Sequence, residues 1–139
     1  MPDLTTTLRE ARVIAVVGCS ATPSRTSYAI SRYLKEVGYR MIPVNPHYIE
    51  IHGEPCYPDL DHLPDDARID MVNIFRRPAH TAEMVRMVIA YAEATGTRPM
   101  IWTQLGVSTR EAEILAEAAG LPYVKNRCIM VEHARLFGS

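Results

Sequence analysis

The sequence predicts an α/β fold, with residues 1–139 forming one doubly wound, Rossmann-like domain around a mostly parallel sheet of about five strands. Short apolar runs alternate along the chain with segments whose apolar residues have helical spacing. The apolar runs are continuous, as in parallel strands that helices cover on both faces. Three helical segments end at a glycine that is followed directly by an apolar run. This β-α-β-α order requires parallel strands with right-handed crossovers, and 139 residues suit one ordinary domain.

The first elements follow from apolar spacing and helix stop signals. Residues 7–11 begin with a Thr-x-x-Glu capping box, which predicts a helical turn before a first strand at residues 12–17. The apolar positions of residues 24–37 have helical spacing, and Gly38 can take the left-handed conformation that ends a helix. A second strand is therefore expected at residues 39–44.

The middle of the chain departs from this regular alternation. Residues 47–65 are rich in Pro, Gly and Asp, which predicts an excursion with one short strand near residues 55–57. An apolar third strand is expected at residues 70–75. Pro78 suits the first position of a helix that should run to Thr95.

The last third of the chain returns to the alternating pattern. A strand at residues 99–103 precedes a Ser-x-x-Glu capping box at residues 108–111, which predicts the start of another helix. Gly120 should end that helix, and residues 121–124 and 129–137 are expected as a last strand and a closing helix. The expected buried stripe of the helix before Gly120 consists of Ala112, Leu115, Ala116 and Ala119.

Composition and charge argue against several classes of function. Sixteen acidic and fifteen basic residues leave a net charge of −1, without the basic surplus that nucleic-acid binding needs. No apolar run approaches the ~20 residues of a membrane span, and the first residues do not resemble a signal peptide. Three widely spaced cysteines are typical of free thiols in a reducing cytosol, and the five histidines lack metal-ligand spacing with them. We therefore expect a cytoplasmic protein without a structural metal.

The candidate site is the junction at residues 18–25 between the first strand and the following helix. Ligands of doubly wound sheets bind beyond the carboxyl ends of the strands, where the strand order reverses. Backbone N–H groups of the loop and the helix start are expected to be unpaired, and the helix dipole adds positive charge there. Ser20, Thr22 and Ser24 add hydroxyl groups, and Arg25 adds a planar cation suited to phosphate. The other strand ends expected at this edge are residues 45–48, 75–77 and 103–106.

This junction departs from the known dinucleotide and ATP motifs. Only Gly18 of the G-x-G-x-x-G pattern is present, and Asn45-Pro46 follow the second strand where an acidic residue would bind ribose. A GxxxxGK[ST] loop is absent from the sequence. These departures argue against NAD(P) and ATP, although the small side chains still allow backbone amides to approach a phosphate.

Six short motifs occur together along the chain: Gly18-x-Ser20-x-x-Pro23-x-Arg25-x-Ser27-Tyr28, Gly38-Tyr39, Pro43-Val44-Asn45-Pro46, Phe75-Arg76-Arg77-Pro78, Trp102-x-Gln104-x-Gly106, and Arg127-Cys128 with Glu132-His133. In combination they resemble the stand-alone CoA-binding domain proteins, which are similar to the amino-terminal CoA-binding domain of the succinyl-CoA synthetase alpha subunit. The resemblance covers roughly residues 8–137. It implies a Rossmann-type fold and a CoA ligand whose phosphates lie at residues 20–23.

The resemblance also implies where the rest of CoA would lie. Phe75-Arg76 and Thr103-Gln104 are expected to line the ligand channel. Tyr48 falls near the position where the synthetase has a lysine, so His47, Arg25 or Arg76 would have to hold the 3′-phosphate. The predicted cofactor-binding residues are Gly18, Ser20, Ala21, Thr22, Pro23, Arg25, Asn45, Tyr48, Phe75, Arg76, Thr103, Gln104 and Gly106.

The favoured function is binding of CoA or an acyl-CoA without catalysis, with a protein partner or a homo-oligomer left open. The synthetase needs a phosphorylated histidine from a second domain, for which a single domain has no room. The alternatives are a small NAD(P)-dependent oxidoreductase, an acyl-CoA-using transferase, and an interaction scaffold with an unused pocket.

No partnered nucleophile can be identified from the sequence. Cys19 lies near a helix start, where the pKa of a thiol tends to fall, but a small buried core residue is the simpler interpretation. Cys128 and His133 are five residues apart and should diverge on one helix, whereas Glu132 and Arg135 have the spacing of an ion pair.

Overall fold

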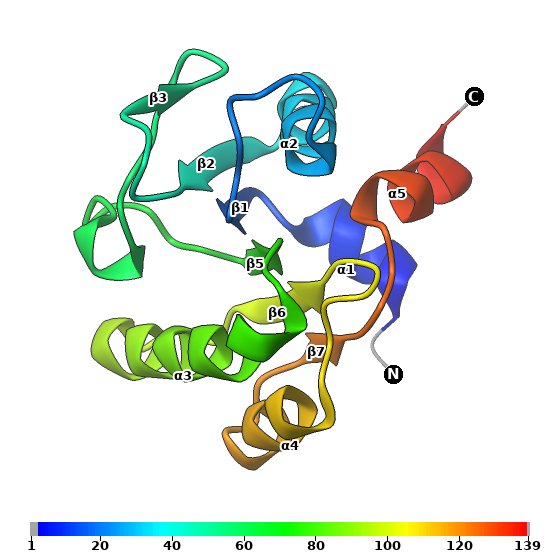
Figure 1. Ribbon diagram of the computed structural model, residues 1–139. Coiled ribbons are helices and arrows are strands. Elements are labelled where there is room, and N and C mark those ends of the chain that lie inside the picture. Colours follow the sequence, from blue (N-terminus) through cyan, green and yellow to red (C-terminus); the bar gives the residue numbers. More distant parts are fainter. Residues whose placement is uncertain (1–2, 139) are drawn as a thin grey trace.

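A five-stranded parallel sheet lies at the centre of the computed structural model, which describes residues 3–138 (Figure 1). Its strands are β1 (Val13–Val17), β2 (Arg40–Val44), β5 (Met71–Ile74), β6 (Met100–Thr103) and β7 (Tyr123–Val124). They lie in the order β2-β1-β5-β6-β7, and all four pairings are parallel. From β1 the chain crosses to β2, which lies on one side of β1, and then returns to β5, which lies on the other side of β1. The order therefore reverses between β1 and β5, which is where doubly wound folds bind ligands.

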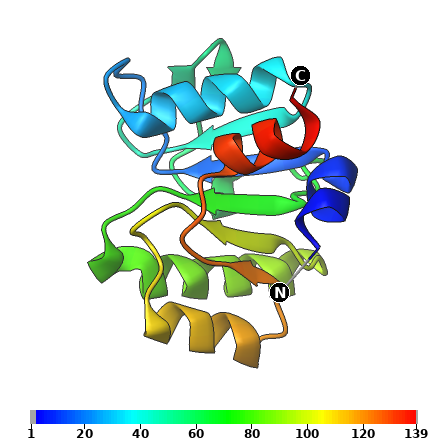
Figure 2. The ribbon, with the colours of Figure 1, turned by 90° about the vertical axis from the view of Figure 1, so that its right-hand side faces the viewer.

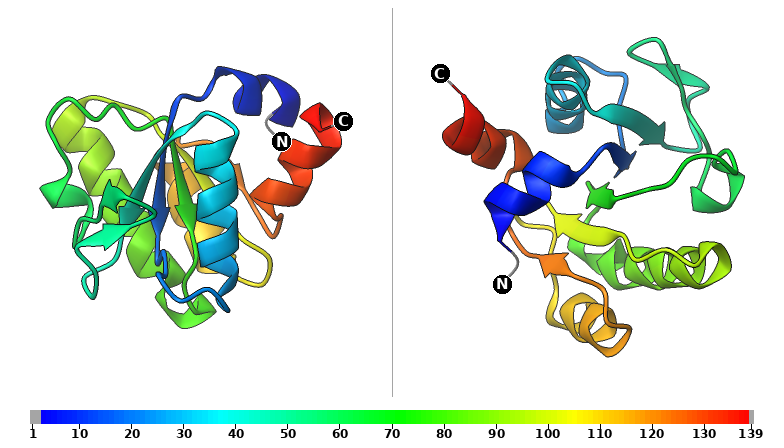
Figure 3. Two further views of the ribbon diagram at one scale, coloured as in Figure 1. Left: turned by 90° about the horizontal axis from the view of Figure 1, so that it is seen from above. Right: turned by 180° about the vertical axis from the view of Figure 1, so that it is seen from behind.

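Helices cover both faces of this sheet, as the doubly wound class requires. The helices are α1 (Leu4–Glu10), α2 (Thr26–Glu36), α3 (Pro78–Thr95), α4 (Arg110–Ala118) and α5 (Ile129–Phe137). Figure 1 shows α2 and α5 on one face and α3 and α4 on the other. The strands point toward the β1–α2 loop in Figure 2, and α1 lies at the opposite, amino-terminal edge in Figure 3.

The two faces of β1 supply two separate apolar cores. Ile14 and Val16 pack on the face of α2 and α5, whereas Ala15 and Val17 pack on the face of α3 and α4. All four side chains are buried, because successive residues of a strand point to opposite faces and both faces are covered. The expected doubly wound α/β fold is thus confirmed.

The first helix begins earlier than the expected turn at residues 7–11. Its N-cap is Asp3, whose carboxylate accepts hydrogen bonds from the amides of Thr5 and Thr6 at 3.1 and 3.4 Å. The predicted capping box that begins at Thr7 is therefore wrong, because an aspartate is an effective N-cap in its own right.

The capping box predicted at residues 108–111 is also displaced. Thr109 is the N-cap of α4 and accepts from the amide of Ala112 at 3.1 Å. The hydroxyl of Ser108 instead lies 2.7 Å from the hydroxyl of Tyr123, so it is not available to cap the helix. The helix also stops at Ala118, and the expected buried position Ala119 is exposed.

The excursion after β2 contains two short strands where one was expected. The strands β3 (Glu50–Ile51) and β4 (Glu54–Pro55) pair in antiparallel register, and a 3₁₀ turn, η1 (Leu60–His62), follows. Two-residue strands have too little periodicity to be recognised in a sequence. Within residues 3–138, no helix is both long and apolar enough to span a bilayer.

Candidate ligand-binding site at the carboxyl edge of the sheet

Gly18 brings the ends of β1 and β5 together at the point of strand reversal. Its backbone has φ of +84°, and a Cβ atom built there would lie 2.0 Å from the carbonyl oxygen of Phe75. The Gly18 amide donates to the carbonyl of Val44 at 2.9 Å. Only glycine combines this conformation with so close an approach, so the residue is required for the geometry of the site.

The loop after Gly18 is held in place by its own serine hydroxyl groups. The amide of Ser20 donates to Oγ of Ser27, and the amide of Thr22 donates to Oγ of Ser20, both at 3.0 Å. The amide of Arg25 donates to the carbonyl of Thr22 at 3.0 Å. The expectation that all loop amides are unpaired is therefore wrong for these three, because the loop folds back on its own side chains.

Unpaired amides remain at the amino-terminal end of α2 and just before it. Within residues 3–138, no acceptor pairs with the amides of Ser24, Thr26 and Ser27. Helix α2 starts at Thr26, two residues later than expected, because its N-cap Arg25 has an extended backbone. The Arg25 side chain makes no capping hydrogen bond. The positive end of the helix dipole is thus directed at this edge without a capping acceptor.

Helix α3 begins at the same edge in the same unusual way. Its N-cap is Arg77, which makes no side-chain capping bond, and neither α2 nor α3 has an acidic residue in its first turn. In contrast, α4 is capped by Thr109 and has Glu111 and Glu113 in its first turn. Asp, Asn, Ser and Thr are the favoured N-caps, and acidic residues favour the first turn. An arginine at both helix starts concentrates positive charge beside the strand reversal.

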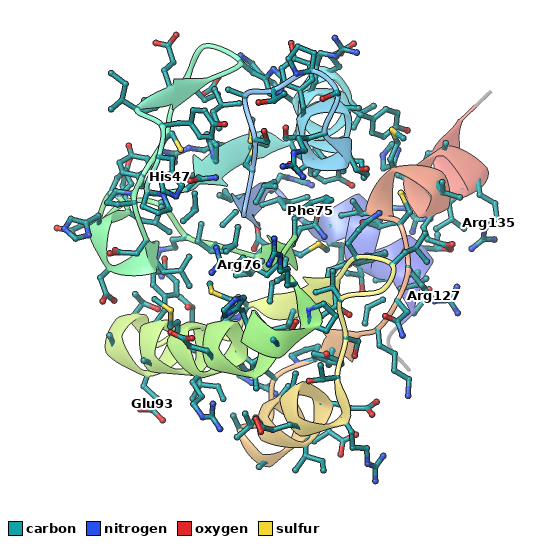
Figure 4. The ribbon with its side chains drawn as sticks, viewed as in Figure 1. His47, Phe75, Arg76, Glu93, Arg127 and Arg135 are labelled. Carbon is teal, nitrogen blue, oxygen red and sulfur yellow. The ribbon has the colours of Figure 1, made fainter. Side chains whose placement is uncertain are left out.

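A first hollow of about 580 Å³ lies over the loop and the start of α2. It is lined by Gly18, Ser20, Thr22, Ser24, Arg25, Thr26, Ser27, Asn45, His47, Tyr48 and Phe75. Figure 4 views this carboxyl edge and labels Phe75 and Arg76 near its centre, with His47 toward the excursion. In the described chain, the wall of this hollow contains no carboxylate.

Tyr48 and Asn45 form the side of the first hollow that β2 supplies. The side chains of Ser20 and Thr22 lower the pKa of Tyr48, so the phenol lies against the loop. Nδ2 of Asn45 donates to the carbonyl of Cys19 at 2.9 Å, and its Oδ1 accepts from the amide of His47 at 2.9 Å. Asn45 therefore uses its side chain to join two loops, and it lines the hollow as a structural residue.

A second hollow of about 480 Å³ continues from the first. It is lined by Arg25, Thr26, Phe75, Arg76, Arg77, Gln104, Leu105 and Val107. The two hollows share Arg25, Thr26 and Phe75, so together they form one trough across the ends of β1, β5 and β6. We call this continuous depression the trough. The second hollow, like the first, has no carboxylate in the part of its wall that the structure describes.

The three arginines of the trough have no partners in the described chain. Ion pairs within residues 3–138 involve other cations, and no hydrogen bond is formed by the guanidinium groups of Arg25, Arg76 or Arg77. This is a local surplus of positive charge in a chain whose net charge is −1. The trough is therefore electrostatically suited to an anion.

Gln104 adds a buried polar group to the second hollow. Its side chain is only 6% exposed, and its Oε1 atom has no hydrogen-bond partner within residues 3–138. A buried acceptor without a partner costs about 1–3 kcal/mol. Because this oxygen has almost no accessible surface, a ligand in the second hollow can donate to it only after the amide group of Gln104 rotates.

Four of the predicted site residues do not line the trough. They are Ala21, Pro23, Thr103 and Gly106. Thr103 is fully buried, and its Oγ1 donates to the carbonyl of Val124 and accepts from the amide of Asn126, at 2.9 and 3.2 Å. The expectation that Thr103 lines the channel is therefore wrong, because its side chain ties β6 to the segment after β7.

Conversely, three trough residues lie outside the segments predicted from the sequence: Thr26, Ser27 and Val107. Val107 directly follows the predicted loop at residues 103–106. Thr26 and Ser27 were not expected at the site, because the helix was predicted to begin at residue 24, two residues before the observed start of α2.

All three cysteines of the chain are free thiols with buried side chains. Cys19 is fully buried, as its interpretation as a small core residue predicts, and burial raises the pKa of its thiol to about 11. The Nδ1 atom of His133 lies 2.8 Å from the hydroxyl of Tyr33. The predicted ion pair of Glu132 with Arg135 is confirmed at 2.6 Å. No group of three or more potential metal ligands occurs within residues 3–138.

The fold and the trough together define a doubly wound α/β domain with a cationic candidate ligand site at its point of strand reversal, whose wall holds no carboxylate among residues 3–138. The chain belongs to the CoA binding domain family, whose sequence model matches residues 12–134. This finding confirms the resemblance that the six motifs indicated.

Relatives of known sequence or structure cover nearly the whole chain. This chain is 34% identical over 127 residues to the protein YneT of Bacillus subtilis (strain 168). The aligned region covers 91% of this chain and 89% of YneT. A hypothetical protein from Pyrococcus horikoshii OT3 has a solved structure with a TM-score of 0.89 and 40% identity, covering 98% of this chain and 91% of that chain.

A third relative matches only a part of each chain. The acetate–CoA ligase (ADP-forming) of Methanocaldococcus jannaschii is 34% identical over 59 residues, which are 42% of this chain and 8% of the ligase.

Proposed function

We propose that this protein binds CoA or an acyl-CoA along the trough. The observation that carries the proposal is the pair of helices, α2 and α3, that begin beside the strand reversal with an arginine and no acidic residue. An anionic ligand stabilises this arrangement, because it supplies the negative charge that the helix starts lack. Membership of the CoA binding domain family supports CoA over other anions of similar charge.

The first hollow is the proposed site of the phosphate groups. Arg25 and the unpaired amides of Thr26 and Ser27 contribute charge-assisted hydrogen-bond donors there. Gly18 allows the ends of β1 and β5 to approach closely beneath this hollow, because a Cβ atom there would meet the carbonyl group of Phe75. His47 lies on the opposite wall and is a further candidate donor.

The second hollow is the proposed site of the pantetheine arm. Its wall combines the apolar side chains of Phe75, Leu105 and Val107 with the free acceptor of Gln104. The arm has the same combination, because its amide N–H groups alternate with methylene groups. An amide N–H of the arm would donate to Oε1 of Gln104 once rotation of the side-chain amide brings that buried atom to the wall of the hollow.

We also propose that the site binds its ligand without catalysing a reaction. The trough of the described chain holds no cysteine, and Cys19 below it is buried with a raised pKa. A nucleophile with a partnered base, which acyl transfer through a covalent intermediate needs, is not among the described wall residues.

Titration calorimetry with CoA, 3′-dephospho-CoA and NADH tests this function directly. We expect saturable binding of CoA and no binding of NADH, and mass spectrometry should detect CoA species released from the purified protein. The absence of both heat and thermal stabilisation with CoA and its dephospho form would exclude the proposal. Binding of NADH in preference to CoA would favour the oxidoreductase alternative.

A further inference from the structure

We infer that the second hollow selects acyl-CoA molecules whose acyl group ends in a carboxylate. The inference rests on the proposed CoA-binding function and adds the chemical class of the acyl group. It depends on the positive charges of Arg76 and Arg77 in the second hollow, for which the uncharged pantetheine arm of CoA supplies no counterion.

Two arginines line the second hollow without lining the first. Arg76 and Arg77 are both exposed, and neither forms an ion pair or a side-chain hydrogen bond with any residue from 3 to 138. The uncapped start of α3 lies at Arg77 and adds the positive end of a helix dipole. Arg76 also borders a smaller hollow that contains Asp59 and Glu83, but it forms an ion pair with neither.

The proposed phosphate site has its own donors. Arg25 and the start of α2 line the first hollow and are available for the phosphate groups of CoA. The pantetheine arm and its thiol are uncharged, so free CoA would leave two guanidinium groups beside a neutral chain. A carboxylate at the end of the acyl group would supply the missing anion within the same hollow.

Gln104 indicates that the arm and this carboxylate can occupy one compartment. Its buried Oε1 atom is unpaired and can only accept a hydrogen bond. An amide N–H of the arm can donate one, whereas a carboxylate has no proton to donate. The hollow of about 480 Å³ therefore offers one acceptor for an amide N–H and two cations for an anion. Leu105 and Val107 provide the apolar surface for the methylene groups between them.

Matched thioether derivatives of CoA test the inference without hydrolysis of a thioester. S-(2-carboxyethyl)-CoA and S-(2-carbamoylethyl)-CoA differ only in a carboxylate replaced by a neutral amide of the same shape. We expect the wild-type protein to bind the carboxylate form about tenfold more tightly, as two partly exposed ion pairs would give. In the variants Arg76→Gln and Arg77→Gln the ratio should fall, and in the double variant it should approach one.

The control variant is Arg68→Gln, which removes an exposed arginine outside the trough. It should keep the wild-type ratio, and thermal unfolding should confirm that all variants fold. Equal affinity of wild-type protein for the two derivatives, with CoA still bound, would overturn the inference and leave the proposed function intact. Failure to bind CoA itself would remove both.

A second result would overturn the inference in a different way. If the double variant lost the difference in affinity between CoA and 3′-dephospho-CoA, the two arginines would hold the 3′-phosphate and not an acyl carboxylate. If that difference persisted while the preference for the carboxylate form was lost, the inference would be supported.

Discussion

Replacement of Gly18 by alanine should destabilise the protein more than replacement of any trough side chain. The substitution introduces a Cβ atom at a residue with φ of +84°, which costs about 1–2 kcal/mol for an L-residue. The same Cβ would lie 2.0 Å from the carbonyl oxygen of Phe75, so the ends of β1 and β5 must separate. Overpacking of this kind costs a further ~1–3 kcal/mol, which gives about 2–5 kcal/mol in total.

Gly106 provides the matched control for this substitution. It also has positive φ, +75°, at the carboxyl edge, but a Cβ built there meets no atom within 4 Å. Gly106→Ala should therefore show only the conformational strain of about 1–2 kcal/mol. Urea denaturation followed by circular dichroism measures both free energies of unfolding.

The comparison between the two variants decides whether the close approach at Gly18 matters. The expected result is a clearly larger loss for Gly18→Ala, together with loss of CoA binding, because the floor of the first hollow is displaced. Equal destabilisation of the two variants would show that the contact with Phe75 is relieved at no cost, and the reasoning would fail.

Three further predictions follow from individual side chains. Arg25→Gln should weaken CoA binding about tenfold and reduce its salt dependence in calorimetry, because one charge-assisted contact to phosphate is lost, whereas Arg68→Gln should change neither. Gln104→Leu should leave the free energy of unfolding unchanged or raise it by about 1 kcal/mol, since it removes an unpaired buried acceptor, and should nevertheless weaken CoA binding; a marked loss of stability would contradict the assignment. Burial raises the pKa of Cys19 from 9.0 to about 11, so the stability that the neutral thiol contributes should be complete below pH 9 and should be lost as the pH rises toward 11. Urea denaturation of wild type and Cys19→Ala between pH 8 and 10.5 measures that loss, and parallel pH profiles of the two proteins would refute it.

Periodicity and stop signals in the sequence were sufficient for most of the fold. The helices α3 and α5 have the predicted bounds, and the five main strands lie within one or two residues of their expected positions. The two helices and the strands β1, β2, β5 and β6 extend over enough residues for their periodicity to be recognised, whereas the two-residue strand β7 was expected from its place after the glycine that ends the preceding helix. The helix starts were less accurate, because several residues near Thr7 and Ser108 can act as N-caps and only the tertiary contacts select one.

The candidate site was predicted as a region, but only partly as a set of contacts. The structure brings Gly18, Arg25, Arg76 and Gln104 to the walls of one trough, since the carboxyl ends of parallel strands meet at one edge. Thr103 was misplaced because it is the last residue of β6 and its side chain is buried, whereas the next residue, Gln104, lines the trough. The pairing of the Ser20 amide with Ser27 could not be predicted, because it depends on how the loop folds back onto α2.

The sequence by itself determined the parallel sheet, the strand ends that form its carboxyl edge and the glycine that begins the site. These features depend on local spacing and on the conformations that single residues allow, which can be recognised along a linear chain. Only the tertiary structure decided which amides remain free, which arginines lack partners and that the carbonyl group of Gln104 is buried without a donor. Such properties depend on which atoms from distant segments come within a few ångströms of one another, and that distance is set by packing.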